Sequence, residues 1–232
     1  MSADTTLPPG QRERAEFPRF GLGRFARRYP PNLTAPALEI RGDIARPLSL
    51  GVELAQLPRV EQVSDFHCVT TWSHRSLRWS GYRFADFYQR LIVPQAAPEA
   101  TATLVVFRGQ DDYRCAMQLE DLLAVDVLLA DRLEDQALGL EHGAPLRLVA
   151  PAHYGYKNVK HLAAIEFWRD ARHYRFPLPY PGLMDHPRGR VALEERGKYL
   201  PGWLFRYLYR PLIAPTVRNF RKAAAEYRAR PQ

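Results

Sequence analysis

The chain has 232 residues, of which 46% are hydrophobic, so it can bury the core of one domain, and its formal net charge is +8. No stretch approaches the roughly 18 consecutive apolar residues of a transmembrane helix, and no basic region followed by an apolar run opens the chain, which argues against a membrane-spanning or secreted protein. Cys68 and Cys115 are the only cysteines, so no disulfide framework is expected and we predict a cytoplasmic protein.

Residues 1–35 are rich in Pro, Gly and Arg and show little periodicity, which predicts an extended N-terminal arm. The central domain is expected over residues 36–170. It opens with two predicted strands, 38–44 and 47–50, and then a short helix over 52–57 that ends at Pro58.

Cys68 stands where a predicted strand gives way to a loop. Val60, Val63 and Phe66 have the spacing of a half-buried strand, and Thr, Ser and His after Cys68 suggest a turn. A thiol at such a place is held rigidly yet can be reached, which suits a nucleophile, a redox partner or a soft-metal ligand. The alternative is a buried cysteine that acts as a small apolar filler.

The next part of the domain mixes a helix with strands. An apolar face, with members at i, i+3, i+4, i+7 and i+8, predicts a core-facing helix stopped by Pro94; it consists of Phe84, Phe87, Tyr88, Leu91 and Ile92. Strands are predicted over 101–107 and 113–118, with Cys115 as core filler in the second. Residues 119–125 are expected to be helical, and 126–130 to lead into a polar connection.

Two loops rich in Gly, Lys, Arg and His, over 141–151 and 154–160, precede a predicted strand over 162–168. Such loops offer backbone N–H groups together with cations, the means of holding a phosphate. Arg147 can contact phosphate oxygens bidentately. The alternative is a pair of solvated basic loops.

A basic C-terminal extension is predicted over residues 171–232. From Arg196 onward it has nine Lys and Arg against one acidic residue, while the rest of the chain is balanced, so the body does not have the composition of a nucleic-acid-binding surface. A helical stripe with a basic opposite face is formed by Val217, Phe220, Ala224 and Tyr227. The stripe either docks on its own domain or attaches to a membrane surface or a redox protein.

Several motifs, in order and spacing, resemble the molybdopterin-binding domain shared by sulfite oxidases and the catalytic subunit of methionine sulfoxide reductase, above all its small single-domain bacterial members. The motifs are Phe66-His67-Cys68-Val69-Thr70-Thr71-Trp72-Ser73, Trp79-x-Gly81, Asp112-Tyr113, His142-Gly143-Ala144-Pro145-x-Arg147 and Tyr154-Gly155-Tyr156-Lys157-Asn158-Val159-Lys160. The resemblance implies an α+β fold of mixed sheets and short helices. Phe17-Pro18-Arg19-Phe20-Gly21 falls where related proteins lay an extended segment against the pterin.

The resemblance also implies a role for individual residues. Cys68 would ligate molybdenum, at one Mo per chain, and the cofactor contacts would be Phe66, His67, Gly109, His142, Arg147, Asn158, Val159 and Lys160. His161 departs from the Trp that many members have, and the resemblance fades after Phe167. Neither a haem domain nor the family's dimerisation domain is present, so we expect a monomer.

The implied activity is oxygen-atom transfer to or from a small oxo substrate, either sulfite or an S- or N-oxide. His74, Arg75 and Arg78, just after Cys68, are candidates to meet the substrate, or else members of a solvated loop. Two other classes stay open, a thiol enzyme that uses Cys68 and a binding module that holds molybdopterin without turnover.

Overall fold

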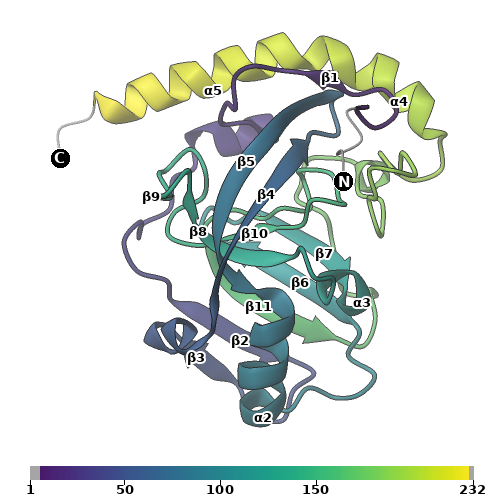
Figure 1. The fold of residues 1–232 in the computed structure, drawn as a ribbon. Coiled ribbons are helices and arrows are strands. Elements are labelled where there is room, and N and C mark those ends of the chain that lie inside the picture. The colour runs from purple at the N-terminus through teal and green to yellow at the C-terminus, as the bar shows by residue number, and fades with distance from the viewer. Residues whose placement is uncertain (1–5, 230–232) are drawn as a thin grey trace.

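The computed structural model describes residues 6–229 and consists of two mixed sheets, a few short helices and a helical C-terminal ridge (Figure 1). One sheet has the order β1-β5-β8-β10, with β4 paired to β5 and β9 to β8. Its strands are β1 (Arg12–Glu13), β4 (Arg59–His67), β5 (Trp72–Arg83), β8 (Leu128–Leu133), β9 (Gln136–Ala137) and β10 (Arg147–Val149). The predicted α+β class is confirmed.

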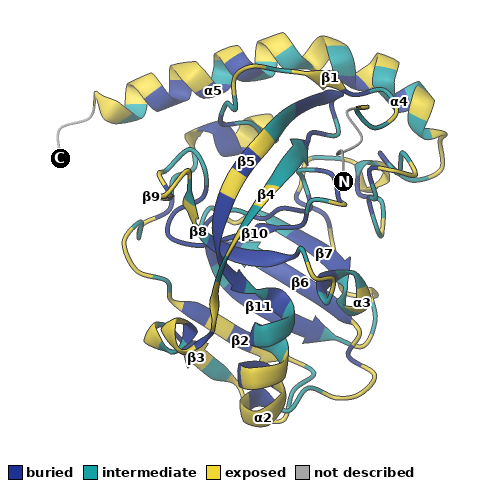
Figure 2. Cartoon of the chain, in the orientation of Figure 1, coloured by how far each residue is buried: buried dark blue, intermediate teal, exposed yellow. Residues whose placement is uncertain are grey.

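The second sheet has the order β3-β2-β11-β6-β7 and forms the lower half of the molecule in Figure 1. Its strands are β2 (Leu38–Gly42), β3 (Leu48–Leu50), β6 (Leu104–Gly109), β7 (Arg114–Gln118) and β11 (Leu162–Trp168). β11 pairs parallel with β2 and antiparallel with β6. These strands match the sequence-based expectation within a few residues. The apolar runs of β6, β7 and β11 are almost wholly buried, whereas β2 alternates buried and exposed residues (Figure 2).

The predicted core helix covers residues 84–96 as α1 (Phe84–Phe87), a π-helical turn (Tyr88–Ile92) and α2 (Val93–Ala96). Its apolar face joins the main core, where Phe84, Phe87 and Ile92 are fully buried. The prediction that Pro94 ends the helix was wrong by two residues. The proline follows the π-helical turn, whose altered hydrogen bonding tolerates a residue without an N–H.

Three strands differ from the sequence-based expectation. The turn after Cys68 is short, and β5 then continues for 12 residues through a stretch we expected to be a loop. Its polar side chains alternate with buried ones, because it lies in the middle of its sheet with one face toward solvent. β8 and β10 were not predicted, since Asp131 and Arg132 interrupt the first and the second has only three residues.

The two chain ends pack against each other above the six-stranded sheet (Figure 1). The N-terminal segment contains β1 and a 3-10 turn at Gly23–Arg27. The C-terminal extension contains α4 (Gly202–Tyr209), a 3-10 turn (Arg210–Leu212) and α5 (Ile213–Arg228). Phe220 and Ala223 of α5 bury Ala26 of the arm, and the rings of Tyr29 and Tyr227 stack at 3.9 Å. Arg230 lies outside the described residues.

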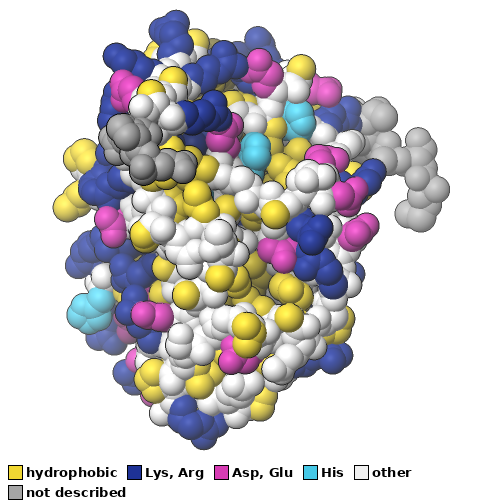
Figure 3. All heavy atoms as spheres, turned by 90° about the vertical axis from the view of Figure 1, so that its left-hand side faces the viewer, with side chains coloured by type: hydrophobic (Ala, Val, Ile, Leu, Met, Phe, Trp, Pro, Cys, Tyr) yellow, Lys and Arg dark blue, Asp and Glu magenta, His cyan; other side chains and the backbone are white. Residues whose placement is uncertain are grey.

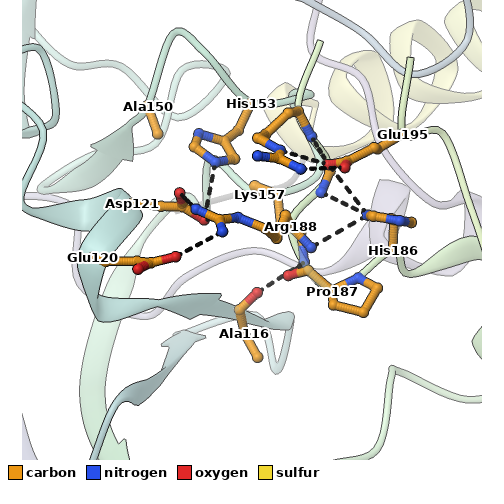
Figure 4. A network of polar contacts seen from close by, with 12 residues as sticks. Ala116, Glu120, Asp121, Ala150, His153, Lys157, His186, Pro187, Arg188 and Glu195 are labelled. Atoms are coloured by element: carbon orange, nitrogen blue, oxygen red, sulfur yellow. Dashed lines mark hydrogen bonds and ion pairs between the residues drawn. The ribbon is translucent and has the colours of Figure 1, made fainter. Parts of the chain in front are cut away.

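A buried polar network fixes the segment before α4 onto the central domain (Figure 4). Lys157 is fully buried, and its Nζ donates to Asp185 Oδ1 at 3.1 Å and to the carbonyls of Ala116 and Pro187. Arg188 pairs with Glu120 and Asp121 of the short helix α3 (Leu119–Leu122). Every cation of this network thus has a carboxylate partner.

Candidate active site

Cys68 occupies a tight turn between β4 and β5. Its N–H donates to Trp72 O at 2.8 Å, and Thr71 N–H donates back to Cys68 O at 3.1 Å. Thr71 has a φ of 79°, the left-handed conformation that such a turn requires. The thiol is 6% exposed, and its Sγ lies 3.1 Å from Thr70 Oγ1. Burial raises the pKa of the Cys68 thiol, while Thr70, Arg196 and Lys160 oppose that shift.

Both chain ends hold the Cys68 turn in place. Gln11 of the N-terminal arm donates its side-chain amide to Cys68 O at 3.1 Å. Arg196 of the C-terminal extension is fully buried and donates to Val69 O at 2.6 Å and to Pro9 O at 2.9 Å. The thiol's position therefore depends on segments 57 and 127 residues away along the chain.

A cavity of about 280 Å³ opens beside Cys68. The central domain contributes Phe66, Trp72, Asn158 and Lys160, among others, to its wall. The two chain ends close it with the segment from Phe17 to Gly23 and with Tyr209, Leu212, Thr216 and Phe220. Phe17-Pro18-Arg19-Phe20-Gly21 therefore lies where the resemblance placed it, against the cavity.

Two buried cations, Arg19 and Arg147, and the half-buried Lys160 stand at or behind this cavity without an ion-pair partner among the described residues. Arg147 is wholly buried, stacks on the Trp79 ring at 4.8 Å and donates only to backbone carbonyls, including that of His142 at 2.9 Å. Lys160 Nζ donates to the carbonyl of Glu141 at 2.7 Å. Arg19 likewise donates only to carbonyls, among them that of Ala26 at 2.8 Å.

Burial lowers the pKa values of two of these cations. It lowers the pKa of Arg147 to about 9 and holds the pKa of Lys160 well below its usual range. Among the described residues, none of the three cations forms an ion pair. The half-buried Asp111 offsets part of the charge of Arg19 and Lys160 without forming an ion pair with either. The positive charge that remains is costly inside a protein, so the residues fit a bound anion such as the phosphate of a pterin cofactor.

Two histidines near the cavity have defined states. Ser73 donates its hydroxyl proton to Gln11 Oε1, so Ser73 Oγ accepts a hydrogen bond from His67 Nδ1, which lies 2.7 Å away. His67 is therefore protonated at Nδ1, and its Nε2 can accept a hydrogen bond. His142 stacks on Phe17 at 4.9 Å, and its buried Nδ1 has no partner among the described residues. Burial lowers the pKa of His142 to about 3, so its ring is neutral and offers an unsatisfied nitrogen to a ligand.

The structure brings four of the nine predicted site residues together around the cavity. Phe66, Cys68, Asn158 and Lys160 line the cavity. The Asn158 side chain is already saturated by Ala150 and neighbouring carbonyls, so only its backbone is available to a cofactor. Val159 is 1% exposed and packs in the main core.

Gly109 lies beside the Lys160 loop because only glycine fits there. A Cβ at this position would stand 2.6 Å from Asp111 Oδ1 and 2.7 Å from Lys160 O. Gly109 is therefore explained by close packing of β6 on the loop that carries Lys160.

The three residues expected to meet the substrate do not line the cavity. His74 and Arg78 lie on β5, where His74 Nδ1 is 2.9 Å from Arg14 O and Arg78 pairs with Asp135 at 3.0 Å. Arg75 lies 3.6 Å from Asp65 and 3.8 Å from Glu13. Sequence proximity to Cys68 was misleading because β5 carries its residues away from the turn.

Sequence reasoning missed the residues that the C-terminal extension adds to the site. Arg196, Tyr209 and Phe220 contact the turn or the cavity, yet nothing in their spacing links them to Cys68. The available signal was the aromatic and apolar stripe of the tail, which predicted a helix and not what that helix covers.

Comparison with known proteins adds family evidence to this geometry. Residues 30–175 match the family model described as oxidoreductase molybdopterin binding domain. The chain is 32% identical over 165 residues to the uncharacterized oxidoreductase YuiH of Bacillus subtilis, a match that covers 71% of this chain and 80% of that protein. It is 29% identical over 186 residues to the protein-methionine-sulfoxide reductase catalytic subunit MsrP of Campylobacter jejuni, covering 68% of this chain and 61% of that protein.

Further matches agree on the fold. The MsrP catalytic subunit of Xanthomonas campestris is 27% identical over 187 residues, which is 69% of this chain and 56% of that protein. Among solved structures, the sulfane dehydrogenase SoxCD of Paracoccus pantotrophus superposes with a TM-score of 0.53 at 22% identity, over 66% of this chain and 43% of that one. The chain thus spans less than two thirds of the MsrP relatives and of the solved structure.

Proposed function

This chain belongs to the oxidoreductase family built on a molybdopterin-binding domain, and we propose that it transfers an oxygen atom from a small, uncharged S-oxide or N-oxide. The observation that carries the proposal is that Cys68, Arg19 and Lys160 line a single cavity, with the buried Arg147 behind it, and that none of the three cations has an ion-pair partner among the described residues. A thiolate and a phosphate site are what a single-cysteine molybdopterin centre needs. The relatives named methionine sulfoxide reductase support the choice of an S-oxide.

In this proposal the chain's own residues hold the cofactor in a fixed pose. Cys68 is the metal ligand, and Arg147 and Lys160 bind the phosphate through charge-assisted hydrogen bonds. His142 donates or accepts through the nitrogen that has no partner in the protein, and Phe66 and His67 lie beside the pterin. When bound, the cofactor supplies a molybdenum ion that exchanges one oxygen atom with the substrate in a two-electron reaction.

The cavity wall favours an uncharged substrate over sulfite. Phe20 and Trp72 meet edge to face at 5.5 Å, and Tyr180, Met184 and Leu212 extend the apolar wall. Arg75 and Arg78, which would suit an oxyanion, pair with carboxylates elsewhere. With Arg147 and Lys160 assigned to the cofactor's phosphate, the apolar wall does not offset the desolvation of a dianion, whereas a methyl or aryl sulfoxide buries its substituents there.

Cys68→Ser tests the assignment of the metal ligand. The variant should fold and keep its pterin, because Arg147 and Lys160 are untouched, but lose more than about a hundredfold of its S-oxide reduction with an artificial electron donor. Metal analysis should give one Mo per chain for the parent. The matched control is Cys115→Ser, since Cys115 is buried in β7, away from the cavity, and its pKa is raised to about 12 by burial.

Other outcomes would select the competing functions. Full activity in Cys68→Ser would remove Cys68 from the reaction. Turnover by metal-free protein that alkylation of Cys68 abolishes would make it a thiol enzyme, and a loaded protein inactive toward sulfite and all S- and N-oxides would make it a binding module. Faster turnover of sulfite than of methyl phenyl sulfoxide would overturn the substrate class. A cytoplasmic location, a monomeric state and the absence of nucleic-acid binding stay predictions.

A further inference from the structure

One side of α4 is buried and the other is apolar yet exposed to solvent. Phe205 and Tyr209 face inward and are at most 5% exposed. Trp203, Tyr207 and Leu208 face outward and are 55%, 70% and 53% exposed. The helix therefore carries more apolar surface than its contacts with the protein use.

The outward residues belong to a larger group, which we call the apolar ridge: Tyr199, Leu200, Trp203, Tyr207, Leu208 and Leu212. Among the described residues, thirteen large hydrophobic side chains are exposed, and these six fall within residues 199–212. Scattered exposed hydrophobic residues are ordinary, but a contiguous group marks a surface that meets an apolar partner.

Unpaired positive charge accompanies the apolar ridge. Arg206, Arg221 and Arg228 form ion pairs with Glu194, Glu16 and Glu141. Arg196 also pairs with Glu194. Within the described part of the chain, no carboxylate ion pair is formed by the other tail cations, which are Lys198, Arg210, Arg218 and Lys222. Arg218 and Lys222 are exposed one turn apart on α5, which continues from α4 along the top of the molecule (Figure 1). Lys and Arg crowd this upper end in the space-filling view (Figure 3).

We propose that the apolar ridge, flanked by Arg218 and Lys222, attaches this protein to the surface of an anionic lipid bilayer. Trp and Tyr have an apolar ring and a polar tip, which suits the boundary between headgroups and acyl chains. The surface is a convex helix with cations beside it, the form of an interfacial helix. No described helix is long and apolar enough to span a membrane, so the attachment is to one face of the bilayer.

The same helices connect this surface with the active-site cavity. Tyr209, Leu212, Thr216 and Phe220 line the cavity beside Cys68. Leu212 is both a cavity-lining residue and 48% exposed in the apolar ridge. Attachment through the ridge therefore brings the edge of the cavity to the bilayer surface.

The test is binding of the full chain to vesicles of phosphatidylcholine mixed with phosphatidylserine, measured by flotation at low and high salt. Trp203→Ser with Tyr207→Ser should lower the partition coefficient by about tenfold or more, because the inserted rings are removed. Arg218→Gln with Lys222→Gln should lower it by about fivefold for each charge. Val63→Ser with Val125→Ser is the matched control, since both valines are exposed elsewhere. Trp203 fluorescence should shift to the blue with vesicles, since Trp72 and Trp79 are already buried and Trp168 is half-buried in β11, away from the ridge.

Three results would overturn the proposal. The first is absence of binding to anionic vesicles at low salt, which is the result expected if the true partner is an acidic soluble protein. Unchanged binding of the Trp203 and Tyr207 variant would reduce the interaction to charge alone. Self-association without vesicles, abolished by the same variant, would make a second copy of this chain the partner.

Discussion

Lys157 and Lys160 stand three residues apart in one loop, and the surroundings of the two ammonium groups differ in kind. Lys157 meets Asp185 at 3.1 Å, inside a network in which Arg188 and Arg190 also have carboxylate partners (Figure 4). Lys160 meets only a carbonyl oxygen and lies near Arg147, which has no carboxylate either. A buried cation balanced by the protein serves the fold, whereas one left unbalanced leaves room for an external anion.

The largest effect on stability is expected when Lys157 loses its carboxylate partner. Asp185→Asn should lower the free energy of unfolding by about 3–5 kcal/mol, because Lys157 would stay buried without a counter-charge. Urea unfolding of the cofactor-free protein measures the change. Arg78→Gln is the matched control and should cost about 1 kcal/mol or less, since Arg78 and its partner Asp135 are both exposed and screened by water. An equal loss of stability in both variants would show that the buried ion pair of Lys157 is no more important to the fold than an exposed one.

Substitution of Arg147 or Lys160, which have no carboxylate partner, should change cofactor affinity more than stability. Arg147→Met or Lys160→Met removes a charge-assisted contact worth about 1.5–3 kcal/mol, so pterin affinity should fall roughly ten- to a hundredfold. Pterin content after dilution and dialysis is the measurement. Arg108→Met disturbs an ion pair with Glu166 within the five-stranded sheet and should leave pterin content unchanged. Equal retention in Arg147→Met and the parent would show that the phosphate lies elsewhere.

The smallest expected effect is the pH dependence of stability that His161, next to Lys160, contributes. Burial lowers the pKa of His161 to about 4, with Lys160, Arg19 and Arg147 adding to the shift. The unfolded chain, with a His pKa near 6.5, binds more protons between those values, so stability is present above about 6.5 and is lost as pH falls toward 4. His161 should account for about 1 kcal/mol of this loss per pH unit, and His142, whose pKa burial lowers to about 3, should add a similar amount.

Chemical unfolding of cofactor-free protein at several pH values tests this expectation. His161→Gln should flatten the dependence, and the same change at exposed His173 should not. A bound phosphate opposes the nearby cations, so the loaded protein should depend less on pH over this range. A pH dependence in the loaded protein as steep as that of the cofactor-free protein would argue against an anion beside Lys160.

Much of the central domain could be predicted from local sequence. The face of the 84–96 helix, the strands of the second sheet and the position of Cys68 after a strand all follow from periodicity and composition within a few residues. The motif around Cys68 and the loops with Arg147 and Lys160 indicated one cofactor site. The structure brings the Cys68 motif and the Lys160 loop to one cavity, with Arg147 behind it. Local patterns suffice here because each reports the burial of its own segment.

Other features were decided only by tertiary structure. Lys157 and Lys160 look equivalent in the sequence, and Asp185, which separates their roles, is 28 residues from the first of them. The roles of Arg19, Arg196 and Phe220 at the cavity depend on two chain ends meeting across nearly 200 residues. Hydrophobic periodicity records that a side chain is buried, but not what buries it, because the partner is chosen by the packing of the whole chain.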